Sequence, residues 1–168
     1  MNHTQAWYWH APGEPDQLTL TRQAIPTPGP DEVLIANRII AFNPVDWKLI
    51  EQGHPHWQPG HVPGVDGMGT LVALGANVTH LRPGTRVAYH TDLRHGGSFA
   101  RHTLVPARAL MPVPDALSDE AAASGFTADA ILVEDNTDLR SILKLRDTWP
   151  NTPALIVRGV ASPEGKPL

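Results

Sequence analysis

The sequence predicts a mainly β fold followed by a short α/β segment. Over residues 1–118, short apolar runs alternate with prolines and glycines, of which the 168-residue chain has 17 and 14. Runs of this length between turn-forming residues are typical of strands in a small barrel or sandwich. From Asp129 the pattern changes to two apolar runs on either side of an amphipathic stretch. We therefore divide the chain into a β domain over residues 1–118 and an α/β tail over residues 119–168.

The first region contains the expected strands and one expected helix. The strands fall on residues 33–35, 69–74, 86–89 and 99–105. Proline-rich turns at 26–31 and 81–85 separate them, the second with Pro-Gly in its central positions. One helical segment is expected over 44–52. Glycines at 64, 67, 69 and 75 interrupt a strand-like stretch, which predicts bulges, sharp bends or close backbone approach there.

The tail predicts one strand-helix-strand unit. A short capped helix is expected over 118–125, because Ser118 can cap its start and Gly125 can end it. An apolar run at 130–133, an amphipathic stretch at 139–149 and a second apolar run at 154–157 follow. Such a unit is right-handed and its two strands are parallel.

Composition limits the function classes. The net charge of -4 arises from 17 acidic and 13 basic residues that form no blocks, so we expect no nucleic-acid or membrane partner. The absence of cysteine excludes disulfides, thiolate catalysis and cysteine-ligated metals. No apolar run approaches the roughly 20 residues of a membrane helix, and the start of the chain does not resemble a signal peptide. We therefore expect a cytoplasmic protein with a small-molecule substrate.

Four motifs between residues 28 and 114 carry a family resemblance. They are PGPDEVLI at 28–35, NPVDWK at 43–48, VPGVDGMG at 62–69 and LRPGTRVA at 81–88. In this order and spacing they resemble the GroES-like catalytic domain of the medium-chain dehydrogenase/reductase superfamily. The likeness is greatest to its zinc-independent, quinone-oxidoreductase-like branch. The resemblance covers somewhat over half of the chain and implies a GroES-like, partly open β-barrel.

The resemblance also implies that no zinc is bound. In zinc-dependent relatives a cysteine ligand falls at the position of Asn43, and the histidine of a Gly-His-Glu motif falls at Val65. An aliphatic side chain cannot ligate a metal.

Three histidines at 54, 56 and 61 are the remaining metal-ligand candidates. Prolines at 55, 59 and 63 make their segment an extended loop without a suitably spaced carboxylate. We prefer to interpret it as a polar loop that carries Trp57 over the mouth of a substrate pocket.

The resemblance implies NADPH as the cofactor, while the protein positions and polarises the acceptor. We hypothesise that Asn43 hydrogen-bonds the nicotinamide or the substrate carbonyl and that Lys48 stabilises negative charge on the reduced acceptor. Both would then contact the cofactor. Asp46 would hold Lys48 or a ribose hydroxyl. The alternative is that Asn43 begins an Asx-type turn into a helix, with Asp46 in its first turn and Lys48 solvated.

The end of the predicted strand at 86–89 offers two further candidates. His90 is a candidate proton donor, and Tyr89 is expected to line the substrate pocket. The alternative for His90 is an ordinary surface histidine at a strand end.

No complete Rossmann domain is expected, because no G-x-G-x-x-G follows residue 118. The segment 129–168 instead resembles a shortened response-regulator receiver. DAILVED at 129–135 resembles its phosphorylated-aspartate strand, TPALIVRG at 152–159 its switch-hydroxyl strand, and Lys166-Pro167 its final Lys-Pro. The alternative is an α/β tail that covers an edge of the barrel.

Two functions from different classes follow. The first is a zinc-independent, NADPH-dependent oxidoreductase of quinones or enones, of which this chain carries the catalytic domain. The cofactor would then come from another subunit or be absent. The second is a non-catalytic binding or assembly module, arising as a truncated or rearranged gene product. A homodimer would then cover apolar surface left on the barrel.

Overall fold

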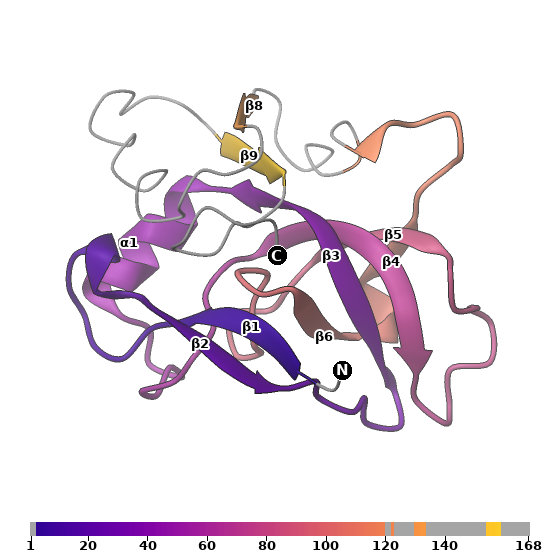
Figure 1. The fold of residues 1–168 in the computed structure, drawn as a ribbon, viewed down its shortest axis with the longest axis horizontal. Helices are drawn as coiled ribbons and strands as arrows, with labels where there is room; N and C mark the ends of the chain where they lie inside the picture. Colours follow the sequence, from indigo (N-terminus) through magenta and orange to yellow (C-terminus); the bar gives the residue numbers. More distant parts are fainter. Residues whose placement is uncertain (1–2, 120–121, 123–129, 134–153, 159–168) are drawn as a thin grey trace.

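A computed structural model describes residues 3–119, 122, 130–133 and 154–158 of the chain. The strands are β1 (His3–Tyr8), β2 (Thr19–Ala24), β3 (Glu32–Phe42), β4 (Asp66–Leu74), β5 (Arg86–His90), β6 (His102–Pro106), β7 (Leu110–Pro112), β8 (Ala130–Val133) and β9 (Ala154–Arg158). The helices are α1 (Pro44–Gln52) and the 3-10 turns η1 (Pro15–Gln17) and η2 (Ala107–Ala109). The predicted mainly β class is confirmed, and the four expected strands and the expected helix are all present (Figure 1).

The long strand β3 organises the larger sheet, whose order is β7-β5-β4-β3-β9-β8 with β6 also paired to β3. The first half of β3 pairs with β6 and its last four residues pair with β9, both antiparallel. β1 and β2 form a separate two-stranded sheet. Within the described residues the sheets stay open, as a partly open barrel requires (Figure 1).

The predicted close backbone approach is present at Gly69, which faces Asn37 across the β3–β4 ladder next to a register shift. A Cβ at Gly69 would lie 2.1 Å from the carbonyl oxygen of Ala36. No side chain fits there, so glycine lets β4 run tightly against β3.

Two apolar clusters form most of the core. The first joins β1, β3 and α1 through aromatic side chains and includes Trp7, Phe42, Ile50 and Phe99. The second fills the space between β3, β4, β5 and β6 and includes Val33, Leu71, Tyr89 and Val105. The first cluster fixes α1 against the sheet, and thereby places the start of the helix at the ends of β3, β4 and β5.

The tail is described only in part. β8 and β9 are parallel, as predicted, and β9 extends the sheet beside β3. Of the predicted helix at 118–125, the structure describes a backbone hydrogen bond of 3.0 Å from Ala122 to Ser118. The predicted helix at 139–149 and the receiver-like residues Glu134, Asp135 and Lys166 lie outside the described residues. No helix in the described part of the chain has the length and apolar character to cross a membrane.

Candidate functional site

The start of α1 is fixed by a buried carboxyl group. Asn43 has extended backbone angles as the N-cap, and Pro44 occupies the first helical position, where its missing N–H costs no hydrogen bond. Asp46, at the third helical position, accepts hydrogen bonds from the backbone N–H of Asn43 at 2.7 Å and of Val65 at 3.1 Å. Asp46 therefore ties the segment before β4 to the entry of the helix.

A second carboxyl group links the helix to the sheet. The Oδ2 of Asp66 accepts a hydrogen bond from the Nδ2 of Asn43 at 2.7 Å, and its Oδ1 lies 2.6 Å from the Nδ1 of His90. Asp66 and His90 are direct partners in the antiparallel β4–β5 ladder, which brings their side chains together. We call these three side chains the Asn43–Asp66–His90 network. Asn43 and Asp66 are buried, while the His90 side chain is 57% exposed.

Burial makes Asp46 electrostatically unusual. Desolvation raises the pKa of the Asp46 carboxyl to about 8, and the nearby charge of Asp66 acts in the same direction. The two backbone N–H groups that bind Asp46 lower its pKa, but burial dominates. Asp46 therefore keeps its proton to a higher pH than an ordinary aspartate does.

Lys48 lies on the exposed side of α1. Residues two apart on a helix do not face each other, and both carboxyl oxygens of Asp46 bind backbone N–H groups. Asp46 therefore does not hold Lys48 in this structure. For these two residues, the geometry is that of the alternative interpretation, a capped helix entry with a solvated lysine.

The two residues expected to line the substrate pocket lie in the core. Trp57 is 5% exposed, donates a hydrogen bond to the carbonyl of Leu93 at 2.8 Å, and stacks on His61 with ring centroids 4.3 Å apart. Tyr89 is fully buried, and its hydroxyl donates to the Oδ1 of Asn37 at 2.6 Å. Burial raises the pKa of Tyr89. Both aromatic residues serve packing here.

The loop histidines form an aromatic cluster. The rings of His54 and His56 lie 5.3 Å apart, and burial together with the neighbouring His54 lowers the pKa of His61 to about 4. Within the part of the chain that the structure describes, no three histidine, aspartate or glutamate side chains are placed to hold a metal ion.

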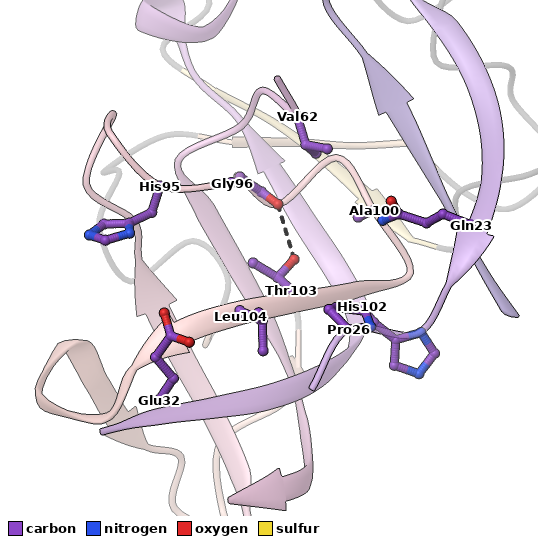
Figure 2. A pocket seen from close by; sticks show the side chains of 11 residues that line it. Gln23, Pro26, Glu32, Val62, His95, Gly96, Ala100, His102, Thr103 and Leu104 are labelled. Atoms are coloured by element: carbon purple, nitrogen blue, oxygen red, sulfur yellow. Dashed lines mark hydrogen bonds between the residues drawn. The ribbon is translucent and has the colours of Figure 1, made fainter. Parts of the chain in front are cut away.

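The structure also contains a surface cavity that the sequence does not predict. It has a volume of about 200 Å³ and lies between β2, β6 and the 95–97 loop. Figure 2 shows His95 and His102 on opposite sides of it, with the Thr103 hydroxyl bonded to the loop backbone. Neither Trp57 nor Tyr89 lines this cavity, and no member of the Asn43–Asp66–His90 network does.

Comparison with known proteins identifies the family. The model of the alcohol dehydrogenase GroES-like domain matches residues 29–115, slightly more than half of the chain. The chain belongs to this family. It is thus a medium-chain dehydrogenase/reductase with a GroES-like domain, and the resemblance carried by the four sequence motifs is confirmed.

Curated relatives of this GroES-like chain include fungal reductases. A trans-enoyl reductase of Aspergillus flavipes is 38% identical over 118 residues, which cover 65% of this chain and 33% of the relative. A trans-enoyl reductase of Aspergillus terreus is 31% identical over 165 residues, covering 92% of this chain and 54% of the relative. The chain therefore spans between a third and about half of the length of these relatives.

Solved structures show the same fold. A mycobacterial protein in complex with NADPH is 26% identical, with a TM-score of 0.66, and the match covers 96% of this chain and 54% of that one. The quinone oxidoreductase from Coxiella burnetii has a TM-score of 0.66 at 19% identity, over 88% of this chain and 54% of that one. The similarity to the Coxiella burnetii enzyme concerns the fold alone.

One member of the network is absent from the residues that the sequence singled out. Asp66 belongs to the VPGVDGMG motif, which draws attention to its glycines and to the lost metal ligand at Val65. The available signal is that Asp66 is the only charged residue in an apolar, glycine-rich strand. A buried carboxylate in such a strand needs polar partners.

Proposed function

We propose that this chain supplies the substrate side of a zinc-independent, NADPH-dependent reductase of enoyl or quinone-type acceptors. The observation that carries the proposal is the Asn43–Asp66–His90 network at the entry of α1. One member, Asn43, stands where zinc-dependent relatives have a cysteine ligand, and Asp66 follows Val65, which stands where they have a histidine ligand. In place of metal ligands the network presents an amide, a carboxylate and an imidazole. The trans-enoyl reductases among the relatives support the choice of acceptor.

The donor set near the network fits the reacting end of a nicotinamide. NADPH, when bound, supplies a hydride. The Nδ2 of Asn43 gives one hydrogen to Asp66 and retains a second, so the amide is suited to a carboxamide or a carbonyl oxygen. The described residues offer no counterpart to a Gly-rich pyrophosphate turn, so the proposal concerns the reacting end alone.

The side chains around the helix entry match the charge changes of enone reduction. Addition of a hydride to the β-carbon of a conjugated carbonyl moves an electron pair onto the carbonyl oxygen, and the α-carbon then takes up a proton. The exposed ammonium group of Lys48 would stabilise the negative oxygen. The partly exposed ring of His90 would give the proton. Asp46, which is buried and bound to backbone, would hold the helix entry in place.

Calorimetry with NADPH tests the first requirement. We expect stoichiometric binding by the full chain, with the affinity lowered in Asn43→Ala. Lys48→Ala is compared with Arg82→Ala as its control. The exposed Arg82 lies on the turn before β5, so its replacement removes the same charge at a site away from the network. The absence of binding at millimolar NADPH would leave the chain without this chemistry and would favour a non-catalytic binding module.

Turnover tests the residue roles. NADPH consumption is measured with a 2-enoyl thioester and with a quinone for the wild type, Asn43→Ala, Lys48→Ala and Arg82→Ala. We expect the first two variants to lose at least about 10-fold in kcat, since removing one donor that stabilises developing charge commonly costs 10²–10³. Arg82→Ala should retain wild-type turnover. Unchanged turnover in both Asn43→Ala and Lys48→Ala would exclude the proposed roles.

A further inference from the structure

We propose that Asp66 is a positioning residue that fixes the orientation of the Asn43 amide and the tautomer of the His90 ring together. Its consequence for turnover rests on the proposed function, whereas the hydrogen-bonding assignment stands on the structure alone. Asp66 reaches two elements at once, because Asn43 caps α1 and His90 ends β5.

The two oxygens of Asp66 are engaged separately. Oδ2 lies 2.7 Å from the Nδ2 of Asn43, and Oδ1 lies 2.6 Å from the Nδ1 of His90. Both are short: charge-assisted hydrogen bonds from nitrogen to a carboxylate span about 2.7–2.9 Å, and these two distances lie at or just below the short end of that range. Asp66 is only 2% exposed, so water cannot replace either partner without opening the site. A buried carboxylate with two donors is held in a single geometry.

The chemistry of a carboxylate decides which atoms carry hydrogen. An ionised carboxylate can only accept, so the side of the Asn43 amide that faces Asp66 must be the NH₂ group. For the same reason the Nδ1 of His90 must carry a hydrogen. In the neutral ring the Nε2 atom is then the basic one. The exposed edge of the His90 ring is therefore the one that exchanges protons.

An asparagine at position 66 cannot reproduce this arrangement, although it has nearly the same shape. Its amide has one acceptor oxygen and one donor nitrogen. If the oxygen stays with Asn43, the new NH₂ group faces the Nδ1 of His90, which must then accept. The neutral His90 ring would switch to the form with hydrogen on Nε2. If the oxygen stays with His90, two NH₂ groups face each other and the Asn43 amide must turn over.

Nitrogen NMR of the full chain reads the tautomer directly. The ¹⁵N shifts of the two ring nitrogens of His90 are recorded at alkaline pH for the wild type, Asp66→Asn and Asp92→Asn. Asp92 is the matched control, because it is a partly exposed aspartate two residues beyond His90 that binds Arg94 instead. His90→Gln assigns the signal.

We expect hydrogen on Nδ1 in the wild type and in Asp92→Asn. In Asp66→Asn we expect either the reversed tautomer or a displaced Asn43 side-chain amide signal. A wild-type His90 with hydrogen on Nε2, which is the form that histidine prefers in water, would overturn the inference without any variant. An Asp66→Asn protein with unchanged His90 and Asn43 signals would overturn it as well. The wild-type spectrum alone therefore decides the matter if Asp66→Asn does not fold.

Kinetics separate positioning from a merely structural role. If the wild type reduces an enoyl acceptor, Asp66→Asn should lower kcat at least about 10-fold, as loss of an orienting partner commonly does for ligating histidines, with little change in KM for NADPH. The fall should be partly restored in Asp66→Glu. A parallel loss in kcat and stability that Asp66→Glu does not relieve would overturn the positioning role. A wild type without turnover would refute the proposed function and leave the NMR result standing.

Discussion

Replacing Gly64 by alanine should destabilise the protein more than the same replacement at Gly84, another glycine with a positive φ. Gly64 has a φ of +98°, and a Cβ there would lie 2.4 Å from both the Cδ1 of Phe99 and the Oγ of Ser98. Its carbonyl accepts the N–H of Ser98 at 3.0 Å. The backbone at Gly64 and the neighbouring residues Ser98 and Phe99 therefore cannot move apart without breaking this hydrogen bond.

Two contributions determine the expected loss of unfolding free energy in Gly64→Ala. A left-handed backbone costs an alanine about 1–2 kcal/mol, and inserting a carbon into a packed core adds about 1–3 kcal/mol. We therefore expect a loss of about 2–5 kcal/mol for Gly64→Ala. Gly84 provides the control, since its φ is +88° but a Cβ there would have no atom within 4 Å. Gly84→Ala should lose only the backbone term of about 1–2 kcal/mol.

Urea unfolding of the two variants and the wild type measures both losses, provided that the three proteins share one m value. A backbone shift at Gly64 in the alanine variant should also disturb the entry of α1, because Val65 follows Gly64 and donates its N–H to Asp46. If Gly64→Ala loses no more stability than Gly84→Ala, the close packing of the segment before β4 against Phe99 is refuted.

Three further predictions concern buried groups. Tyr89→Phe should cost about 1–3 kcal/mol by urea unfolding, because the acceptor oxygen of the partly buried Asn37 loses its donor; no loss would mean that water replaces the hydroxyl. The pKa of Asp46 is raised from 3.8 to about 8, so between these pH values the folded protein holds a proton that the unfolded chain releases. The folded state is therefore stabilised relative to the unfolded chain at low pH, and this stabilisation is lost as the pH rises toward 8. His61, whose pKa is lowered to about 4, has the opposite effect below its ordinary value of 6.5. Unfolding free energies should therefore fall between pH 6.5 and 8 in the wild type but not in Asp46→Asn, and equal slopes would contradict the prediction. Ile50→Ala should cost about 2–5 kcal/mol because it empties the space between α1 and the aromatic core; a loss below 1 kcal/mol would show that the helix is not held there.

Local signals in the sequence predict the helix and the strands of the first region well. The helix begins and ends where predicted, because an N-cap, a proline and a terminal glycine mark its ends. β1 and β2 are not predicted, although they flank the aromatic core. β1 mixes polar and aromatic side chains and β2 is mostly polar. Their pairing joins residues more than ten positions apart. Propensity alone does not distinguish such strands from loops.

The candidate site is predicted in part, and strand register explains the difference. A motif predicts Asn43 as a site residue, and the end of a predicted strand predicts His90. Their link through Asp66 depends on which residues of β4 and β5 lie opposite each other. Successive residues of a strand point to opposite faces. Tyr89 therefore enters the core while the neighbouring His90 reaches the site. The end of a predicted strand, which brings both residues near a pocket, does not contain this distinction.

The most direct test of the central claim is NADPH consumption by the purified chain in the presence of an enoyl thioester or a quinone. We predict consumption that requires both the chain and the acceptor, that falls sharply in Lys48→Ala, and that persists in Arg82→Ala. Consumption that is absent with every acceptor, or equal in the two variants, would contradict the assignment of the α1 entry as the substrate side of a reductase.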